Sequence, residues 1–280
     1  MLFGSWNLSF RMLLSSNPMT IQHLIDTSCL DRLDTELLIA HVLGQTRSFV
    51  IAHPEAVIDE PQSSMLALLI KRRENGEPLS LITGTKEFFG REFLVTRDTL
   101  IPRPATEAIV EKVLQFLRNE EVKTEEVDSG ISAYVCRYHN VPVQAVLDVG
   151  TGSGCIALTL ALEGVRLPII GVDTSHAAIK VAEKNRAKFI VPNVQLTQED
   201  GANVVRNFHR PFLLVSNPPY IPTGTILEKT VHDFEPHRAL FAGKDGLDVI
   251  TPLLMAARHN PNCCGVIMEL KTEQIGKLPE

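Results

Sequence analysis

Apolar residues in the first third of the chain recur at the three-to-four spacing of helices. One apolar face, which ends at Gly44, consists of Leu37, Leu38, Val42 and Leu43. Another, which ends near Gly76, consists of Met65, Leu66, Leu69 and Ile70. Glycine commonly ends helices because it adopts the left-handed conformation without strain. The pattern predicts a tail over residues 1–18 and a helical domain over residues 19–84.

The spacing changes after residue 84. Phe88-Phe89, Gly90-Arg91 and the run from Glu92 to Val95 are typical of a β-hairpin, so residues 85–103 form a connector. A helix and a linker are expected over residues 104–144. The helix has one apolar face formed by Ile109, Val110, Val113, Leu114 and Leu117. Residues 119–144 show no periodicity and are interpreted as a linker or surface insertion.

From residue 145 to residue 280, short apolar runs alternate with helical segments. The runs are Val146-Leu147, Ile169–Val172, Val194–Thr197, Phe212–Ser216 and Gly265–Leu270. This alternation predicts an α/β domain with a mostly parallel, Rossmann-like sheet. About ten residues follow the last run, so we expect a truncated sheet whose final strand has an exposed edge.

A glycine-rich loop, Gly150-Thr151-Gly152-Ser153-Gly154, follows the first of these strands. Its GxGxG spacing differs from the GxGxxG fingerprint of dinucleotide sites and fits a loop that holds the methionine part of S-adenosylmethionine. Asp173 could accept hydrogen bonds from ribose hydroxyls, and Asp200 from an adenine amino group. Taken singly, each acid is more often a solvated loop residue. The residues expected to bind the cofactor are Gly150, Thr151, Gly152, Ser153, Gly154, Asp173, Asp200, Gly201 and Asn217.

The tetrapeptide Asn217-Pro218-Pro219-Tyr220 directly follows an apolar strand. An amide nitrogen is a poor nucleophile because its lone pair is delocalised into the carbonyl. The Asn217 side-chain oxygen and the Pro218 carbonyl could accept its two N–H groups and orient it, while Tyr220 offers a flat wall. These four residues are the candidate catalytic residues, although a proline turn capped by asparagine also explains the tetrapeptide.

Several segments together resemble the HemK/PrmC family of release-factor glutamine methyltransferases. They are Arg32–Gly44, Gly76–Gly90, Leu100–Glu107, Asp148–Ala157, Val215–Pro222 and Asp233–Asp248. The resemblance implies a class I methyltransferase that uses S-adenosylmethionine to methylate the glutamine of the GGQ motif of a peptide chain release factor. It also implies that the helical domain, residues 19–84, is a substrate-binding domain that helps to hold the release factor. It also places Arg103 near the site, where a structural salt bridge is an equal interpretation.

The chain departs from the family pattern at three places. Ala105 stands where an acidic residue is usual, Gly201 where a bulky residue often lies over the adenine, and Glu269–Lys271 where a glycine-containing stretch is usual. The family's final helix and antiparallel strand pair have no counterpart after the last apolar run, which leaves a truncated, non-catalytic cofactor-binding protein as an alternative.

Charge and composition bear on the remaining alternatives. The formal net charge of -6 argues against binding nucleic acid directly, which disfavours methylation of an exocyclic amine on DNA or RNA. Five cysteines without CxxC spacing and scattered histidines predict no metal site and a reducing compartment. We therefore expect a cytoplasmic enzyme with no membrane partner. The mitochondrial matrix is the alternative.

Overall fold

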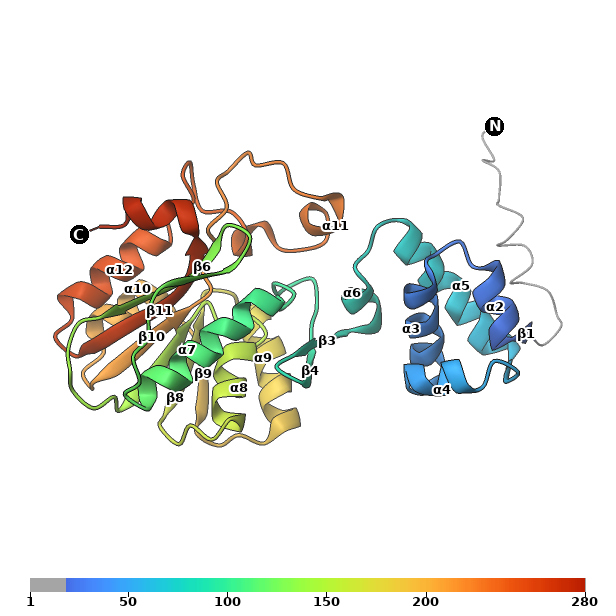
Figure 1. Cartoon of the computed structure of the whole chain (residues 1–280), viewed down its shortest axis with the longest axis horizontal. Helices are drawn as coiled ribbons and strands as arrows, with labels where there is room; N and C mark the ends of the chain where they lie inside the picture. The colour runs from blue at the N-terminus through green and yellow to red at the C-terminus, as the bar shows by residue number, and fades with distance from the viewer. Residues whose placement is uncertain (1–18, 280) are drawn as a thin grey trace. The chain divides into compact units, whose positions relative to one another are not determined.

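The computed structural model describes residues 19–279, so the predicted tail lies outside the described residues. The chain divides between Thr83 and Gly84 into two compact units. Figure 1 shows a first unit of helices and a second unit built on a central sheet. Within residues 19–279, no helix combines the length and apolar character that a membrane crossing requires.

The first unit is a small helical bundle, as predicted. Its helices are α2 (Ile21–Thr27), α3 (Arg32–Leu43), α4 (Arg47–Ala52), α5 (Glu60–Glu74) and α6 (Leu79–Thr83). Helix α3 ends at Gly44, whose φ of 60° gives the expected left-handed cap. Two-residue strands β1 (Met19–Thr20) and β2 (Val57–Ile58), which helical spacing could not indicate, pair antiparallel at its edge.

The second unit has a seven-stranded sheet in the order β5-β6-β11-β10-β7-β8-β9. The parallel strands are β7 (Ala145–Val149), β8 (Ile169–Asp173), β9 (Val194–Gln198), β10 (Phe212–Ser216) and β11 (Cys263–Lys271). All five coincide with the predicted apolar runs, which confirms the mostly parallel sheet.

Helices cover both faces of this sheet (Figure 1). Those on one face are α7 (Glu107–Leu117), α8 (Cys155–Leu162) and α9 (His176–Phe189). Those on the other are α10 (Gly201–Asn207) and α12 (Ile250–His259). Neighbouring strand residues serve opposite faces: Val146 packs in the α8 core, while Ala145 and Leu147 pack in the α12 core. Strands β7, β8, β10 and β11 are largely buried on both faces and have mostly apolar sequences. In the edge strand β9 (VQLTQ), only Val194 is buried.

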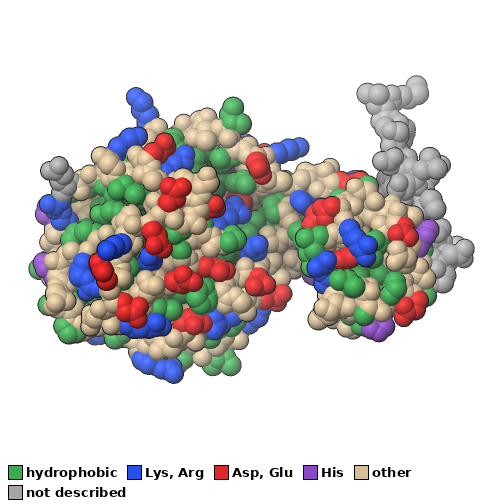
Figure 2. All heavy atoms as spheres, in the orientation of Figure 1, with side chains coloured by type: hydrophobic (Ala, Val, Ile, Leu, Met, Phe, Trp, Pro, Cys, Tyr) green, Lys and Arg blue, Asp and Glu red, His purple; other side chains and the backbone are tan. Residues whose placement is uncertain are grey.

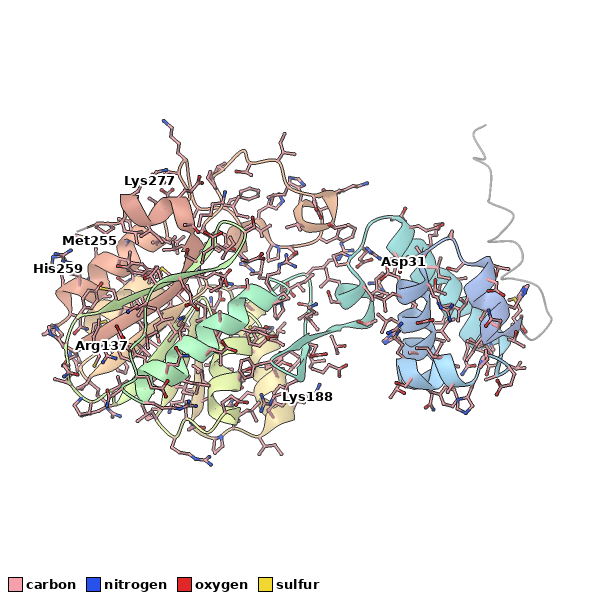
Figure 3. The ribbon with its side chains drawn as sticks, in the orientation of Figure 1. Asp31, Arg137, Lys188, Met255, His259 and Lys277 are labelled. Atoms are coloured by element: carbon pink, nitrogen blue, oxygen red, sulfur yellow. The ribbon has the colours of Figure 1, made fainter. Side chains whose placement is uncertain are left out.

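The prediction of a linker over residues 119–144 is wrong. Strands β5 (Glu125–Asp128) and β6 (Ile131–Arg137) form a hairpin, and β6 pairs antiparallel with β11 from Gly265↔Arg137 to Lys271↔Ile131. The predicted exposed edge of β11 is therefore also wrong. Strand β6 is held by packing as well as by hydrogen bonds, since the Arg137 guanidinium lies 3.7 Å from the centre of the Phe116 ring (Figure 3).

The predicted β-hairpin is confirmed by strands β3 (Thr85–Phe88) and β4 (Arg91–Leu94), which belong to the second unit. Its two-residue turn has positive φ angles at Phe89 (52°) and Gly90 (70°), which suits the twist of paired strands. The Phe89 amide also donates to Glu107 Oε1 at 2.8 Å. This bond ties the turn to the first residue of α7.

Candidate functional site

A cavity of about 320 Å³ opens where β7, β8 and β10 reach their carboxyl ends. Ligands of open α/β sheets bind at this edge. The predicted residues that line it are Gly150, Thr151, Gly152, Ser153, Asp173, Asp200, Gly201, Asn217 and Pro219. Gly154, Pro218 and Tyr220 lie next to these residues in sequence but are not part of the lining. Leu100, Thr106 and Arg238 complete the wall from segments that sequence reasoning did not assign to the cofactor.

The glycine loop takes a shape that glycine favours. Gly150, Gly152 and Gly154 have φ angles of 75°, 57° and 81°, which side chains rarely allow. Behind the loop, Asp148 Oδ2 accepts hydrogen bonds from the Thr151 hydroxyl at 2.7 Å and from the Ala157 amide at 3.1 Å. Asp148 thus joins the end of β7 to the loop and to α8.

Asp148 is fully buried, and burial raises its pKa to about 6. The Thr151 hydroxyl and the Ala157 amide oppose this shift because they stabilise the charged form. Its second oxygen, Oδ1, has no hydrogen-bond partner among the described residues. The loop therefore rests on a buried carboxyl group that is anchored through one of its two oxygens.

The two candidate acids sit where a nucleoside could be bound. Asp173 Oδ2 accepts from the Gly152 amide at 3.0 Å, and Asp173 Oδ1 accepts from the Ser175 amide at 2.8 Å. Asp200 caps α10 by accepting from the Asn203 amide at 2.8 Å through Oδ1. Each carboxylate oxygen has more than one acceptor site, so these bonds leave capacity for a ligand.

The cavity also fits S-adenosylmethionine in its polarity and its shape. The Ser153 hydroxyl in its wall is buried without a hydrogen-bond partner among the described residues, which leaves it available to a polar ligand. An added Cβ at Gly150 would lie 3.8 Å from the Asn217 carbonyl oxygen. The glycine loop and the NPPY segment therefore lie side by side, as transfer from a bound cofactor to a held amide would require.

Gly201 is explained by its neighbour. A Cβ at this position would lie only 2.2 Å from Val149 Cγ1, the side chain that ends β7. A larger residue here would need Val149 to move. Glycine at position 201, where the family often has a bulky residue, therefore leaves room for the side chain of Val149.

The NPPY segment is held by a buried polar network. Asn217 Nδ2 donates to Thr106 Oγ1 at 2.9 Å, and Thr106 Oγ1 donates to Glu269 Oε2 at 2.7 Å. Tyr220 donates its hydroxyl to Glu269 Oε1 at 3.0 Å, while Gln274 Nε2 donates to the Tyr220 carbonyl at 2.9 Å. The Tyr220 ring packs partly into the α12 core. Sequence reasoning missed Thr106, Glu269 and Gln274, although Thr106 lies within the family-like segment Leu100–Glu107.

Glu269 is a buried acid at the centre of this network. Burial raises its pKa, whereas the Thr106 and Tyr220 hydroxyls, the Asn217 amide and the Arg103 charge lower it. Arg103 itself forms an ion pair with the buried Glu235, whose other oxygen accepts from the Ile101 amide at 3.0 Å. The structural salt bridge considered for Arg103 is thus present, close enough to the site to influence Glu269.

Family models match both parts of the chain. The PrmC N-terminal domain matches residues 27–84, and the methyltransferase small domain matches residues 116–241. The sheet, the glycine loop and the cavity at its carboxyl edge define an S-adenosylmethionine-dependent methyltransferase.

Curated relatives give the family. A release factor glutamine methyltransferase of Koribacter versatilis is 38% identical over 79% of this chain and 72% of its own length. Relatives with the same name from Coxiella burnetii and Escherichia coli are 35% and 34% identical over 85% and 81% of this chain, and 77% and 74% of their own lengths. The chain belongs to the release factor glutamine methyltransferase family.

Proposed function

We propose that this protein transfers a methyl group from S-adenosylmethionine to the side-chain amide nitrogen of the glutamine in the GGQ motif of a peptide chain release factor, and so supports translation termination. The observation that carries the proposal is the Asn217 amide, held beside the glycine loop with its NH₂ group engaged by Thr106. The relatives' names support the choice of substrate.

The residues would act mainly by orienting the substrate. Bound S-adenosylmethionine supplies an electrophilic methyl group. Asn217 Oδ1 and the Pro218 carbonyl would accept the two N–H groups of the glutamine amide and direct its nitrogen toward the cavity. The amide nitrogen that accepts this methyl group would then lose one proton to water. No strong general base is needed, because the nitrogen becomes acidic as it gains the methyl group.

The cofactor would be held by the residues that line the cavity. The main-chain groups of Gly150 and Gly152 would approach its methionine part, and Asp173 would accept hydrogen bonds from its ribose hydroxyls. Asp200 would accept from its adenine amino group beside Gly201. The surface adds no support for a nucleic-acid substrate, since basic and acidic side chains are interspersed on the face that Figure 2 displays.

A labelling experiment tests the proposal. The purified chain is incubated with methyl-labelled S-adenosylmethionine and a release factor, beside a release factor whose GGQ glutamine is replaced by alanine. Label on the first and not on the second supports the reaction and its target. Equal labelling of both, or none on either while the cofactor still binds, would reject the GGQ glutamine as the substrate.

A further inference from the structure

The polar network behind the NPPY segment spans three parts of the second unit. Thr106 belongs to the short helical turn Pro104–Thr106, Glu269 lies in the interior of β11, and Asn217 follows β10. Thr106 is 2% exposed and Glu269 is 1% exposed. Buried hydrogen-bonding groups of this kind have few alternative partners, so the direction of each hydrogen bond is determined by the others.

With Glu269 ionised, counting hydrogens fixes these directions. A threonine hydroxyl has one hydrogen, and an ionised carboxylate only accepts. Thr106 therefore gives its hydrogen to Glu269 and can only accept from Asn217. Only the NH₂ end of the Asn217 amide can face Thr106. The oxygen of Asn217 is left for another donor, in a residue that lines the cavity.

We propose that Glu269 is a positioning residue, which acts through Thr106 to hold the Asn217 amide with its oxygen available to the N–H group of the methyl-accepting amide. The inference rests on the proposed function, because the acceptor it prepares is the one that would bind the glutamine. Glu269 touches neither substrate nor cofactor in this scheme. Its part is to prevent the Asn217 amide from turning its NH₂ group toward the substrate.

The other oxygen of Glu269 strengthens the arrangement. Tyr220 donates its hydroxyl to Oε1, so the carboxylate receives hydrogen bonds from both sides. A carboxylate serves both donors at once, whereas a glutamine at this position offers one oxygen and one NH₂ group. An amide could therefore satisfy only one of the two hydroxyl donors without reversing the other hydrogen bond.

Thr106 gives the first test through two matched substitutions. Thr106→Val keeps the shape of the side chain and removes the acceptor for Asn217, while Thr106→Ser keeps the hydroxyl. We expect Thr106→Val to lower kcat by about 10²-fold with little change in the Kd of S-adenosylmethionine, since misorientation of one group has costs of this order. Thr106→Ser should restore most of the rate. Equal rates in the two variants would overturn the proposal.

A swap of charge gives the second test. Asn217→Asp alone places a carboxylate against Thr106, whose hydrogen is already held by Glu269. Adding Glu269→Gln lets Thr106 donate to the carboxylate introduced by the first change and accept from the amide introduced by the second. Both hydrogen bonds of Thr106 are then restored in the reverse direction, and the oxygen of the introduced amide still accepts from Tyr220. We expect the double variant to turn over about tenfold faster than Asn217→Asp alone, as coupled residues do. Losses that simply add, or a slower double variant, would overturn the proposal.

A third measurement needs no substrate. In protein labelled with ¹⁵N at asparagine, the Asn217 side-chain signals are those that Asn217→Asp removes. Glu269→Gln and Thr106→Val should shift them, while Glu273→Gln, a change at an exposed acid just after β11, should not. Unshifted signals would overturn the proposal. Shifted signals in a protein that cannot label a release factor would support the coupling and reject the proposed function.

Discussion

The side-chain amide of Asn185 donates a hydrogen bond of 2.9 Å to the carbonyl of Ser153 in the glycine loop. The same side chain accepts from the Leu94 amide at 2.8 Å and donates to the Leu94 carbonyl at 3.0 Å. Asn185 is fully buried on α9, and its hydrogen bond to Ser153 is buried, while the two to Leu94 are partly buried. One side chain thus joins the β3–β4 hairpin to the cofactor loop.

Replacing Asn185 by alanine should weaken both folding and cofactor binding. The change leaves the buried Ser153 carbonyl without its partner, which costs about 1–3 kcal/mol, and also removes the two partly buried bonds to Leu94. Asn193→Ala is the matched control, because Asn193 also donates to two main-chain carbonyls, those of Val165 and Leu167, but does not contact the loop. Denaturant unfolding and calorimetric titration with S-adenosylmethionine measure the two effects. An equal loss of affinity in both variants would contradict the role given to Asn185.

Replacing Asn217 by alanine should separate chemistry from cofactor binding. The variant loses the oxygen proposed to accept the glutamine N–H group, but the glycine loop and Asp173 keep their positions. We expect turnover to fall by about 10²-fold or more, since a correctly placed acceptor acts through orientation. The Kd of S-adenosylmethionine should change little. Full activity in this variant would remove Asn217 from the mechanism.

Gly201 and Val149 should behave as a coupled pair. Gly201→Ala forces its new methyl group against Val149 Cγ1, at a distance of 2.2 Å before relaxation. Overpacking of this kind costs about 1–3 kcal/mol, and the displaced valine would narrow the cavity that both residues line. Adding Val149→Ala should recover stability and cofactor affinity. The free energies of unfolding of the parent, the two single variants and the double variant give the coupling energy between the two residues. Additive changes would show that the two sites are independent.

The parallel core was predictable because β7, β8, β10 and β11 are largely buried on both faces and have mostly apolar sequences. The hairpin at Glu125–Arg137 was not. Strand β6, with the sequence ISAYVCR, places Ala133 toward the α8 core and Tyr134 toward the α12 core, so it shows neither clear alternation nor a long apolar run. Its partner β11 lies far along the chain, so the sequence near β6 gives no signal of the pairing.

The candidate site likewise has one part that the sequence predicts and another that it does not. The glycine loop and NPPY are contiguous, so their spacing carries the signal. Glu269 and Thr106 are 163 positions apart and meet only because β11 and the turn before α7 pack together. From the sequence alone, Glu269 is therefore interpreted as a departure from the family pattern and not as a residue of the site.

The raised pKa of Asp148 predicts a pH dependence of stability. Its pKa is about 6 in the folded protein and near 3.8 when exposed, so the folded state binds a proton more tightly between these values. The stabilisation from protonation is fully present below pH 3.8 and is lost as the pH rises through 6, with a total of about 3 kcal/mol. Asp148→Asn keeps the shape of the side chain but cannot ionise. The side-chain oxygen of this variant can still accept hydrogen bonds from Thr151 and Ala157. The difference in free energy of unfolding between variant and parent, measured with urea, should shift toward the variant by most of this amount from pH 4 to pH 7. A constant difference across that range would mean that Asp148 titrates normally.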